Sequence, residues 1–120
     1  PYMPWRYEPN CIVYTGTHDN NTAIGWWRLD ATEEEKRHLQ EYLGHAVDES
    51  TVHWELIQVA LSSPARVAII PVQDLLGVDE RGRMNVPGTS VDNWQWQLGH
   101  GEMDTACFAR LAELTALNNR

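Results

Sequence analysis

Cysteine is scarce in this chain, and a long apolar run is missing. The 120 residues include two cysteines, Cys11 and Cys107, each in an apolar pattern. We therefore expect both to be small buried residues in a reducing compartment. No apolar run approaches the roughly 20 residues that a membrane-spanning helix needs, and no charged-then-apolar leader follows Pro1. These absences predict a soluble chain without a signal peptide.

Positive charge is also scarce. Nine Lys and Arg residues stand against 17 Asp and Glu residues, which gives a formal net charge of −8. Proteins that bind phosphate backbones need clustered Lys and Arg, and the sequence has no such cluster. The charge therefore argues against nucleic acid and against an anionic membrane surface as partners, while a neutral ligand fits it well.

The histidines lack the spacing of metal ligands. We predict no metal site and assign solvated or capping roles to His38, His45, His53 and His100.

Tryptophan, by contrast, is abundant. Core packing is the default role of a tryptophan, and its face can also stack on the apolar face of a sugar ring. We expect packing for all four of the paired tryptophans, Trp26, Trp27, Trp94 and Trp96.

Two short apolar runs, residues 11–16 and 65–70, predict buried parallel strands. Between them, Thr32 and Glu35 form a capping-box pattern that opens a helix to about Leu43, which Gly44 ends. A second helix begins with a cap at Asp48 and ends at residues 62–64. A long polar loop follows over 79–94. The last helix, over about 102–118, has one apolar face formed by Phe108, Leu111, Leu114 and Leu117.

This order of elements predicts an α/β fold built from βα units. Two strands can neither close a barrel nor make a parallel sheet that is covered on both faces. The chain is therefore predicted to be part of a larger α/β fold. In the isolated chain, the open strand edges would favour pairing with another copy.

Polar side chains follow both predicted strands. His18 and Asp19 come two and three residues after Gly16, and Asp74 has the corresponding place after the second strand. Catalytic groups of (β/α)₈ barrels lie at such strand ends, and carboxylates there suit glycosyl transfer through an oxocarbenium-like state. From residue types alone, the simpler interpretation is that Asp19 caps the following helix and His18 is a loop residue, and Asp74 could simply end a strand.

Five motifs carry a resemblance to a known family. The stretches "YTGTHDNNT", "GWW", "IIPVQDLLG", "RMNVPGT" and "NWQW" occur in this order over nearly the whole chain. Together they resemble the 4-alpha-glucanotransferases of glycoside hydrolase family 77, also called amylomaltases or disproportionating enzymes. The resemblance implies that residues 1–120 are a single segment, the C-terminal portion of a (β/α)₈ TIM barrel. This incomplete fragment would have two main parallel strands and several helices.

The resemblance also implies an activity. The family transfers α-1,4-glucan segments between maltodextrins by a retaining mechanism with an aspartate nucleophile and a glutamate acid/base. Both would lie upstream of Pro1, so we expect the isolated chain to be inactive. Asp19 matches the family's third essential carboxylate, which holds and distorts the sugar. His18 matches a neighbour that binds this sugar, and Asn85 a loop residue near the cleft. We add Asp74 as a further candidate for substrate binding. The family needs no cofactor or metal and implies a cytoplasmic location, or the stroma of a plant plastid.

The chain departs from the family pattern at three positions. Asn21 stands where aspartate is common, Asp92 where glycine is common and Gln97 where arginine is common. The last two put the usual geometry of the loop and one ion pair in question. None of the three touches the His18–Asp19 pair.

Two alternative functions remain open at this point. A non-catalytic carbohydrate-binding module would bind maltodextrins without cleaving them. An HD-type metal phosphohydrolase would need further histidines and aspartates on helices around a metal, whereas here the doublet follows a strand and a glycine.

Overall fold

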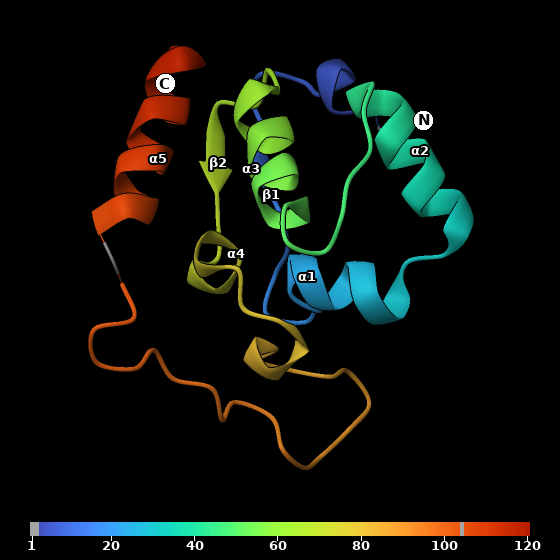
Figure 1. Cartoon of the computed structure of the whole chain (residues 1–120), viewed down its shortest axis with the longest axis vertical. Helices are drawn as coiled ribbons and strands as arrows, with labels where there is room; N and C mark the ends of the chain where they lie inside the picture. The colour runs from blue at the N-terminus through green and yellow to red at the C-terminus, as the bar shows by residue number, and fades with distance from the viewer. Residues whose placement is uncertain (1–2, 104) are drawn as a thin grey trace.

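The computed structural model describes residues 3–103 and 105–120. Two strands alternate with helices along the chain, and short 3₁₀ or π-helical turns (η1–η3) lie between them (Figure 1). The elements are η1 (Pro4–Arg6), β1 (Ile12–Tyr14), α1 (Ala23–Gly25), η2 (Trp26–Asp30), α2 (Glu33–Leu43), α3 (Val52–Ser62), β2 (Val67–Ile69), α4 (Val72–Leu76), η3 (Glu80–Gly82) and α5 (Thr105–Leu117). No helix among these residues is both long enough and apolar enough to cross a membrane.

The two strands pair in parallel, as predicted. Ile12 pairs with Val67, Val13 with Ala68 and Tyr14 with Ile69. The chain between the strands is helical, and its last helix, α3, packs beside them (Figure 1). This is one βα unit followed by a second strand, so the α/β class is confirmed.

The prediction that both strands are buried is wrong. Val13 is buried, but its neighbours Ile12 and Tyr14 are 50% and 46% exposed. In β2, Val67 and Ile69 are 42% and 44% exposed. The exposed residues alternate with buried or half-buried ones in both strands and pair with one another, so one face of the pair is open to solvent. Each strand also has a single neighbouring strand among the described residues. The apolar composition of the strands is therefore suited to a larger sheet than these residues form.

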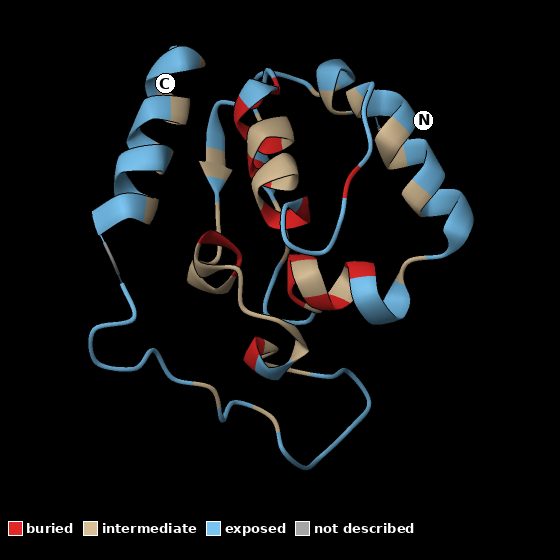
Figure 2. Ribbon diagram, viewed as in Figure 1, coloured by how far each residue is buried: buried red, intermediate tan, exposed pale blue. Residues whose placement is uncertain are grey.

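Helix α3 is the centre of the core. It contributes Ala60 to a cluster with Val13 and Ala65, and Val52 to a cluster with Trp27 and Val47. Its Ile57 and Leu61 form a third cluster with Leu75 of α4. Figure 2 shows the buried residues gathered on α3 and around α1, whereas α2 and α5 are largely exposed. Trp27 is buried and Trp26 packs against the same cluster, which confirms the predicted packing of both.

The ends of α2 follow the sequence pattern. The Glu35 N–H donates to Thr32 Oγ1 at 3.1 Å, and the Thr32 N–H donates back to Glu35 Oε2 at 2.8 Å. Gly44 ends the helix with φ at +80°, a conformation that glycine adopts without steric cost. The capping box, Leu43 as the last helical residue and the glycine stop are thus all confirmed.

The predicted cap of α3 is wrong. Thr51, not Asp48, occupies the N-cap position. The carboxylate of Asp48 instead accepts hydrogen bonds from the N–H of Ser50 at 2.8 Å and from its hydroxyl. These bonds lower the pKa of Asp48. Aspartate forms such local turns as readily as it caps helices, which explains the error of three residues.

Helix α5 packs through part of the predicted apolar face, since Leu111 and Leu114 are confirmed as its contacts with the core. Leu111, Leu114 and the half-buried Cys107 contact the Ile57 cluster. Phe108 and Leu117 are 43% and 71% exposed, so their place in the predicted apolar face is wrong. The other cysteine, Cys11, is also half-buried rather than buried.

Candidate functional site

The loop after β1 presents His18 and Asp19 to solvent. A turn holds it, in which the Thr17 N–H donates to Asn20 Oδ1 at 2.8 Å and the Asn20 N–H donates to the Thr17 carbonyl at 3.1 Å. The side chain of Thr22 caps α1 by accepting from the Gly25 N–H at 3.0 Å. Asp19 is therefore not the cap of the following helix, and its carboxylate is available for other contacts.

Asn85 meets Asp19 across 66 positions of sequence. Its Nδ2 donates to Asp19 Oδ1 at 2.7 Å, and His18 Nε2 lies 3.4 Å from the same oxygen. The side chains of His18 and Asp19 are 60% and 49% exposed. Three of the four predicted site residues are thus brought together in one polar cluster that solvent can reach. None of the described residues donates a hydrogen bond to Asp19 Oδ2.

Arg83 holds the two loops of this cluster together. Its Nη2 donates to the Asp19 carbonyl and its Nε to the Asn85 carbonyl, both at 3.0 Å. The Asn85 N–H also donates to the His18 carbonyl at 3.0 Å. Sequence reasoning did not single out Arg83, although it is the first residue of the "RMNVPGT" motif.

A second contact positions the segment before Arg83. Arg28 of η2 lies with Nη1 3.3 Å from Glu80 Oε2 and 3.5 Å from Asp79 Oδ2. Asp79 also pairs with Arg81, and hydrogen bonds from Arg81 lower the pKa of the Asp79 carboxyl. These ion pairs join η3 to the helical segment that follows the His18–Asp19 loop.

Trp94 is exposed beside His18, where packing had been expected. The centroids of the two rings are 5.3 Å apart at an interplanar angle of 37°, and Trp94 is 58% exposed. Trp94 has φ at +61°, an outlier for a bulky side chain. The backbone N–H of Trp94 donates to the Met84 carbonyl at 2.6 Å. Strained backbone concentrates at functional sites, so Trp94 joins the cluster as a residue that sequence reasoning missed.

Asp74 lies within α4. It is 3% exposed, and its two carboxylate oxygens accept from Thr15 Oγ1 at 2.6 Å and from the Ala23 N–H at 2.8 Å. Asp74 thus joins the end of β1 to the start of α1, and both of its oxygens are already used within the chain. Substrate binding by Asp74 stays a prediction, while the structure gives it a clear part in holding the loop.

Clefts lie on both sides of the 17–20 loop. One, of about 420 Å³, is lined by residues that include His18, Asp74 and Arg83. The other, of about 440 Å³, is lined by residues that include Asp19, Asn21 and Arg83. An accessible carboxylate, imidazole and amide in such clefts can bind hydroxyl groups and can stabilise positive charge. The part of the chain that the structure describes holds no group of three or more His, Cys, Asp and Glu side chains suited to a metal ion.

At two of the three positions that depart from the family pattern, the structure shows a special backbone conformation or a specific side-chain contact. Asp92, where glycine is common, has φ at +59°, which glycine tolerates best. Asn21 donates to Asp30 Oδ2 at 2.9 Å, and its Oδ1 lies so close to Gly25 that a Cβ there would clash. The third departure, Gln97, is an exposed residue.

Comparisons with known proteins agree on one family. The family described as 4-alpha-glucanotransferase matches residues 1–102. The chain is 43% identical over 123 residues to 4-alpha-glucanotransferase DPE1, chloroplastic/amyloplastic, of Oryza sativa subsp. japonica, covering 100% of this chain and 20% of that protein. It is 39% identical over 126 residues to the 4-alpha-glucanotransferase of Thermus thermophilus, covering 100% of this chain and 25% of that protein.

A solved structure agrees in fold. The amylomaltase from Streptococcus agalactiae, determined in complex with acarbose, superposes with a TM-score of 0.89 at 30% identity, over 98% of this chain and 23% of that one. The chain thus spans about a fifth to a quarter of the length of these relatives. With a family match over most of its residues and a shared fold, the chain belongs to the 4-alpha-glucanotransferase family.

Proposed function

We propose that this chain is the part of a 4-alpha-glucanotransferase that binds the glucose unit next to the glycosidic bond that is cleaved. The whole protein would transfer α-1,4-glucan segments between maltodextrins by a retaining mechanism. The hydrogen bond from Asn85 to Asp19, with His18 beside the same oxygen, is the observation that carries this proposal. The amylomaltase relative that was solved with acarbose supports a sugar ligand.

The role of Asp19 follows from its contacts. The amide of Asn85 fixes one carboxylate oxygen, so the other oxygen is presented in a set direction and can accept from a sugar hydroxyl. A carboxylate held in this way interacts more strongly with an oxocarbenium-like transition state than with the neutral ground state. Asp19 therefore stabilises and distorts the sugar, and Asn85 holds the Asp19 carboxylate in position.

His18 and Trp94 act on the same sugar. The exposed imidazole is positioned to hydrogen-bond a hydroxyl of the ring, and the indole beside it limits how far the imidazole can turn. The exposed indole also offers an apolar face to the C–H groups of a glucose unit.

The wider setting is a (β/α)₈ barrel, of which residues 1–120 form the C-terminal portion. The aspartate nucleophile and glutamate acid/base would come from other strands of this barrel, so the isolated chain would not transfer glucan. The exposed faces of β1 and β2 support a larger sheet. The enzyme would work in the cytoplasm, or in the plastid stroma if the source is a plant.

The test is Asp19→Asn in the full-length protein. Removing an electrostatic stabiliser costs on the order of 10²–10³ in kcat, so maltotriose disproportionation should slow by that factor, with folding unchanged. Glu34→Gln, on the exposed side of α2, is the matched control and should keep the wild-type rate. An Asp19→Asn enzyme with a near-wild-type kcat would mean that the carboxylate has no such role.

A further inference from the structure

One carboxylate holds both ends of the loop that carries His18 and Asp19. This loop leaves β1 at Thr15 and enters α1 at Ala23. The Thr15 hydroxyl donates to Asp74 Oδ2 at 2.6 Å, and the Ala23 N–H donates to Asp74 Oδ1 at 2.8 Å. The two contacts reach across 59 and 51 positions of sequence. Both ends of the loop are therefore tied to a single side chain of α4.

The carboxylate of Asp74 is shielded from solvent. Asp74 and Ala23 are both buried. A carboxylate is unfavourable to bury unless hydrogen bonds replace its water, and each oxygen of Asp74 accepts one from an end of the loop. The Ala23 N–H lies in the first turn of α1, where a donor has no partner within the helix. Neither group can move away without leaving a buried polar atom unpaired.

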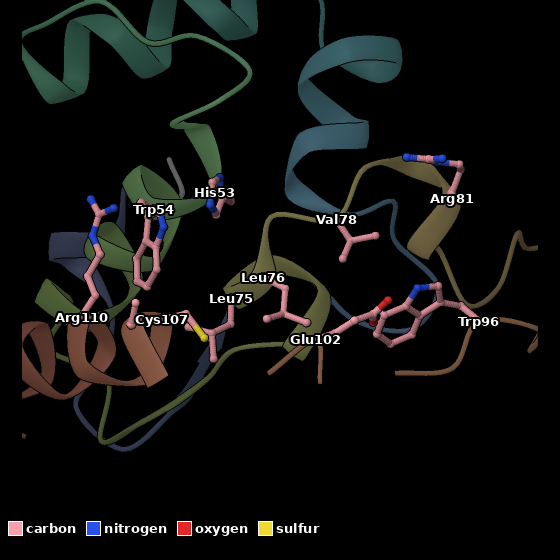
Figure 3. Close-up of a pocket in the computed structure, with 11 residues that line it drawn as sticks. His53, Trp54, Leu75, Leu76, Val78, Arg81, Trp96, Glu102, Cys107 and Arg110 are labelled. Atoms are coloured by element: carbon pink, nitrogen blue, oxygen red, sulfur yellow. The ribbon is translucent and has the colours of Figure 1, made fainter. Parts of the chain in front are cut away.

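The helix that carries Asp74 is fixed to the core. Its next residue, Leu75, belongs to the cluster with Ile57 and Leu61 of α3. Figure 3 shows Leu75 near Cys107 of α5, which packs against the same cluster. A side chain on a packed helix is held more precisely than one on a loop, so Asp74 is a fixed point for the ends of this loop.

Hydrogen bonds within the loop connect its ends to Asp19. The Thr17 N–H donates to Asn20 Oδ1 at 2.8 Å, and the Asn20 N–H donates to the Thr17 carbonyl at 3.1 Å. The Asp19 N–H also donates to Thr17 Oγ1 at 3.4 Å. These bonds limit the internal freedom of the loop, so a displacement at Thr15 would also displace the Asp19 carboxylate.

We propose that Thr15 and Asp74 are positioning residues for Asp19. They fix the ends of the loop, whereas Asn85 and Arg83 bond to Asp19 itself, so the carboxylate is held from two directions before a sugar binds. The inference rests on the proposed function, in which Asp19 interacts more strongly with the transition state than with the ground state. A displaced Asp19 should therefore lower kcat and leave KM nearly unchanged.

The first experiment is Thr15→Val in the full-length protein, with maltotriose as the substrate. Valine has the shape of threonine but cannot donate to Asp74. Because small misplacements of a catalytic group lower the rate strongly, kcat should fall about 5- to 20-fold while KM changes less than about twofold. Thr15→Ser keeps the hydroxyl and should restore most of the rate.

Thr115→Val is the matched control. The hydroxyl of Thr115 is also half-buried and also donates at 2.6 Å, but its acceptor is the Leu111 carbonyl within α5. This variant should keep the wild-type kcat, which shows that loss of a half-buried hydroxyl is not enough to slow the enzyme.

A second experiment asks whether Thr15 acts through Asp19. In the Asp19→Asn background, Thr15→Val should lower kcat no further, because the carboxylate that it positions is gone. A purely structural role for Thr15 would instead lower the melting temperature and leave the kcat of the folded enzyme unchanged.

The outcomes separate this inference from the proposed function. An unchanged kcat in Thr15→Val, or the same fall in kcat with and without the Asp19 carboxylate, overturns the positioning role. If Thr15→Val does not fold, Asp74→Asn takes its place, since an amide has one acceptor oxygen where a carboxylate has two. It must lower kcat in the same way, and a rise in KM alone would overturn the role. An Asp19→Asn enzyme with a near-wild-type kcat overturns the proposed function instead.

Discussion

Single residues in the 92–94 turn decide how the site is shaped. Asp92 and Trp94 both have positive φ, at +59° and +61°. In this turn the ring of Trp94 lies beside the ring of His18. An L-residue is less stable there than in the right-handed region by about 1–2 kcal/mol, so the turn is sensitive to substitution.

Asp92→Val should disrupt this turn, whereas Asp92→Gly should keep it. A β-branched residue disfavours positive φ more than aspartate does, and glycine has no such penalty. In the full-length protein, we expect the valine variant to raise the KM for maltotriose several-fold and the glycine variant to match the wild type. Equal kinetics for the two variants would show that the turn does not govern the site.

Trp94→Ala should weaken sugar binding at the cleft. Loss of an aromatic contact typically lowers affinity about 3- to 10-fold, and His18 would also gain freedom to turn. We expect the KM for maltotriose to rise by this factor, with a smaller fall in kcat. Trp94→Phe should recover most of the loss. If Trp94→Ala bound maltotriose like the wild type, its indole would have no part in the cleft.

At the scale of the element, local capping stabilises α2. The helix has no buried residue among its eleven, so tertiary packing holds it weakly and the capping box matters more. Leu39 and Leu43 are its partly buried contacts with the Trp27 cluster.

Thr32→Ala should therefore loosen α2 by about 1 kcal/mol. Amide hydrogen exchange in the first turns of α2 should become about fivefold faster. Thr51→Ala is a matched control, because Thr51 is also an N-cap but makes no capping hydrogen bond from its side chain. Amide exchange in α2 should stay at the wild-type rate in Thr51→Ala. If α2 exchanged at the same rate in both variants, the capping box would contribute little to its stability.

We expect the stability of the fold to depend on pH through His53, a buried residue of α3. Burial lowers the pKa of His53 and the charge of Arg110 lowers it further, while Asp74 opposes both by raising it. Below about pH 6.5 the unfolded chain therefore binds a proton that folded His53 resists. The free energy of unfolding should fall as the pH drops through this window, and it should level off below the folded pKa.

Chemical denaturation of the wild type and of His53→Gln between pH 5 and 8 would test this. The variant should show a shallower dependence on pH below 6.5, because glutamine does not titrate. Parallel curves for the two proteins would mean that His53 titrates alike in the folded and unfolded states.

At the scale of the molecule, the two-stranded sheet has open edges. Ile12, Tyr14, Val67 and Ile69 leave apolar surface exposed beside unpaired strand backbone. We expect the isolated chain to self-associate through these strands. Light scattering at rising concentration should show dimers or larger species, and Val67→Lys should reduce them. A wild-type chain that stays monomeric at high concentration would contradict the prediction.

The sequence alone determined what depends on neighbours within a few positions. Thr32, Glu35 and Gly44 bound α2 as predicted, since a cap needs only residues one turn apart. The parallel pairing of the strands followed from their apolar runs and the helices between them, and the family followed from five ordered motifs.

Tertiary structure decided what depends on residues far apart in sequence. Only the fold brings Asn85 to Asp19, buries His53, uses both oxygens of Asp74 and turns Trp94 toward His18. It also leaves β1 and β2 half exposed, although their composition predicts burial. The physical reason is that burial and long-range hydrogen bonds depend on which surfaces meet, and no local pattern of residue types encodes that.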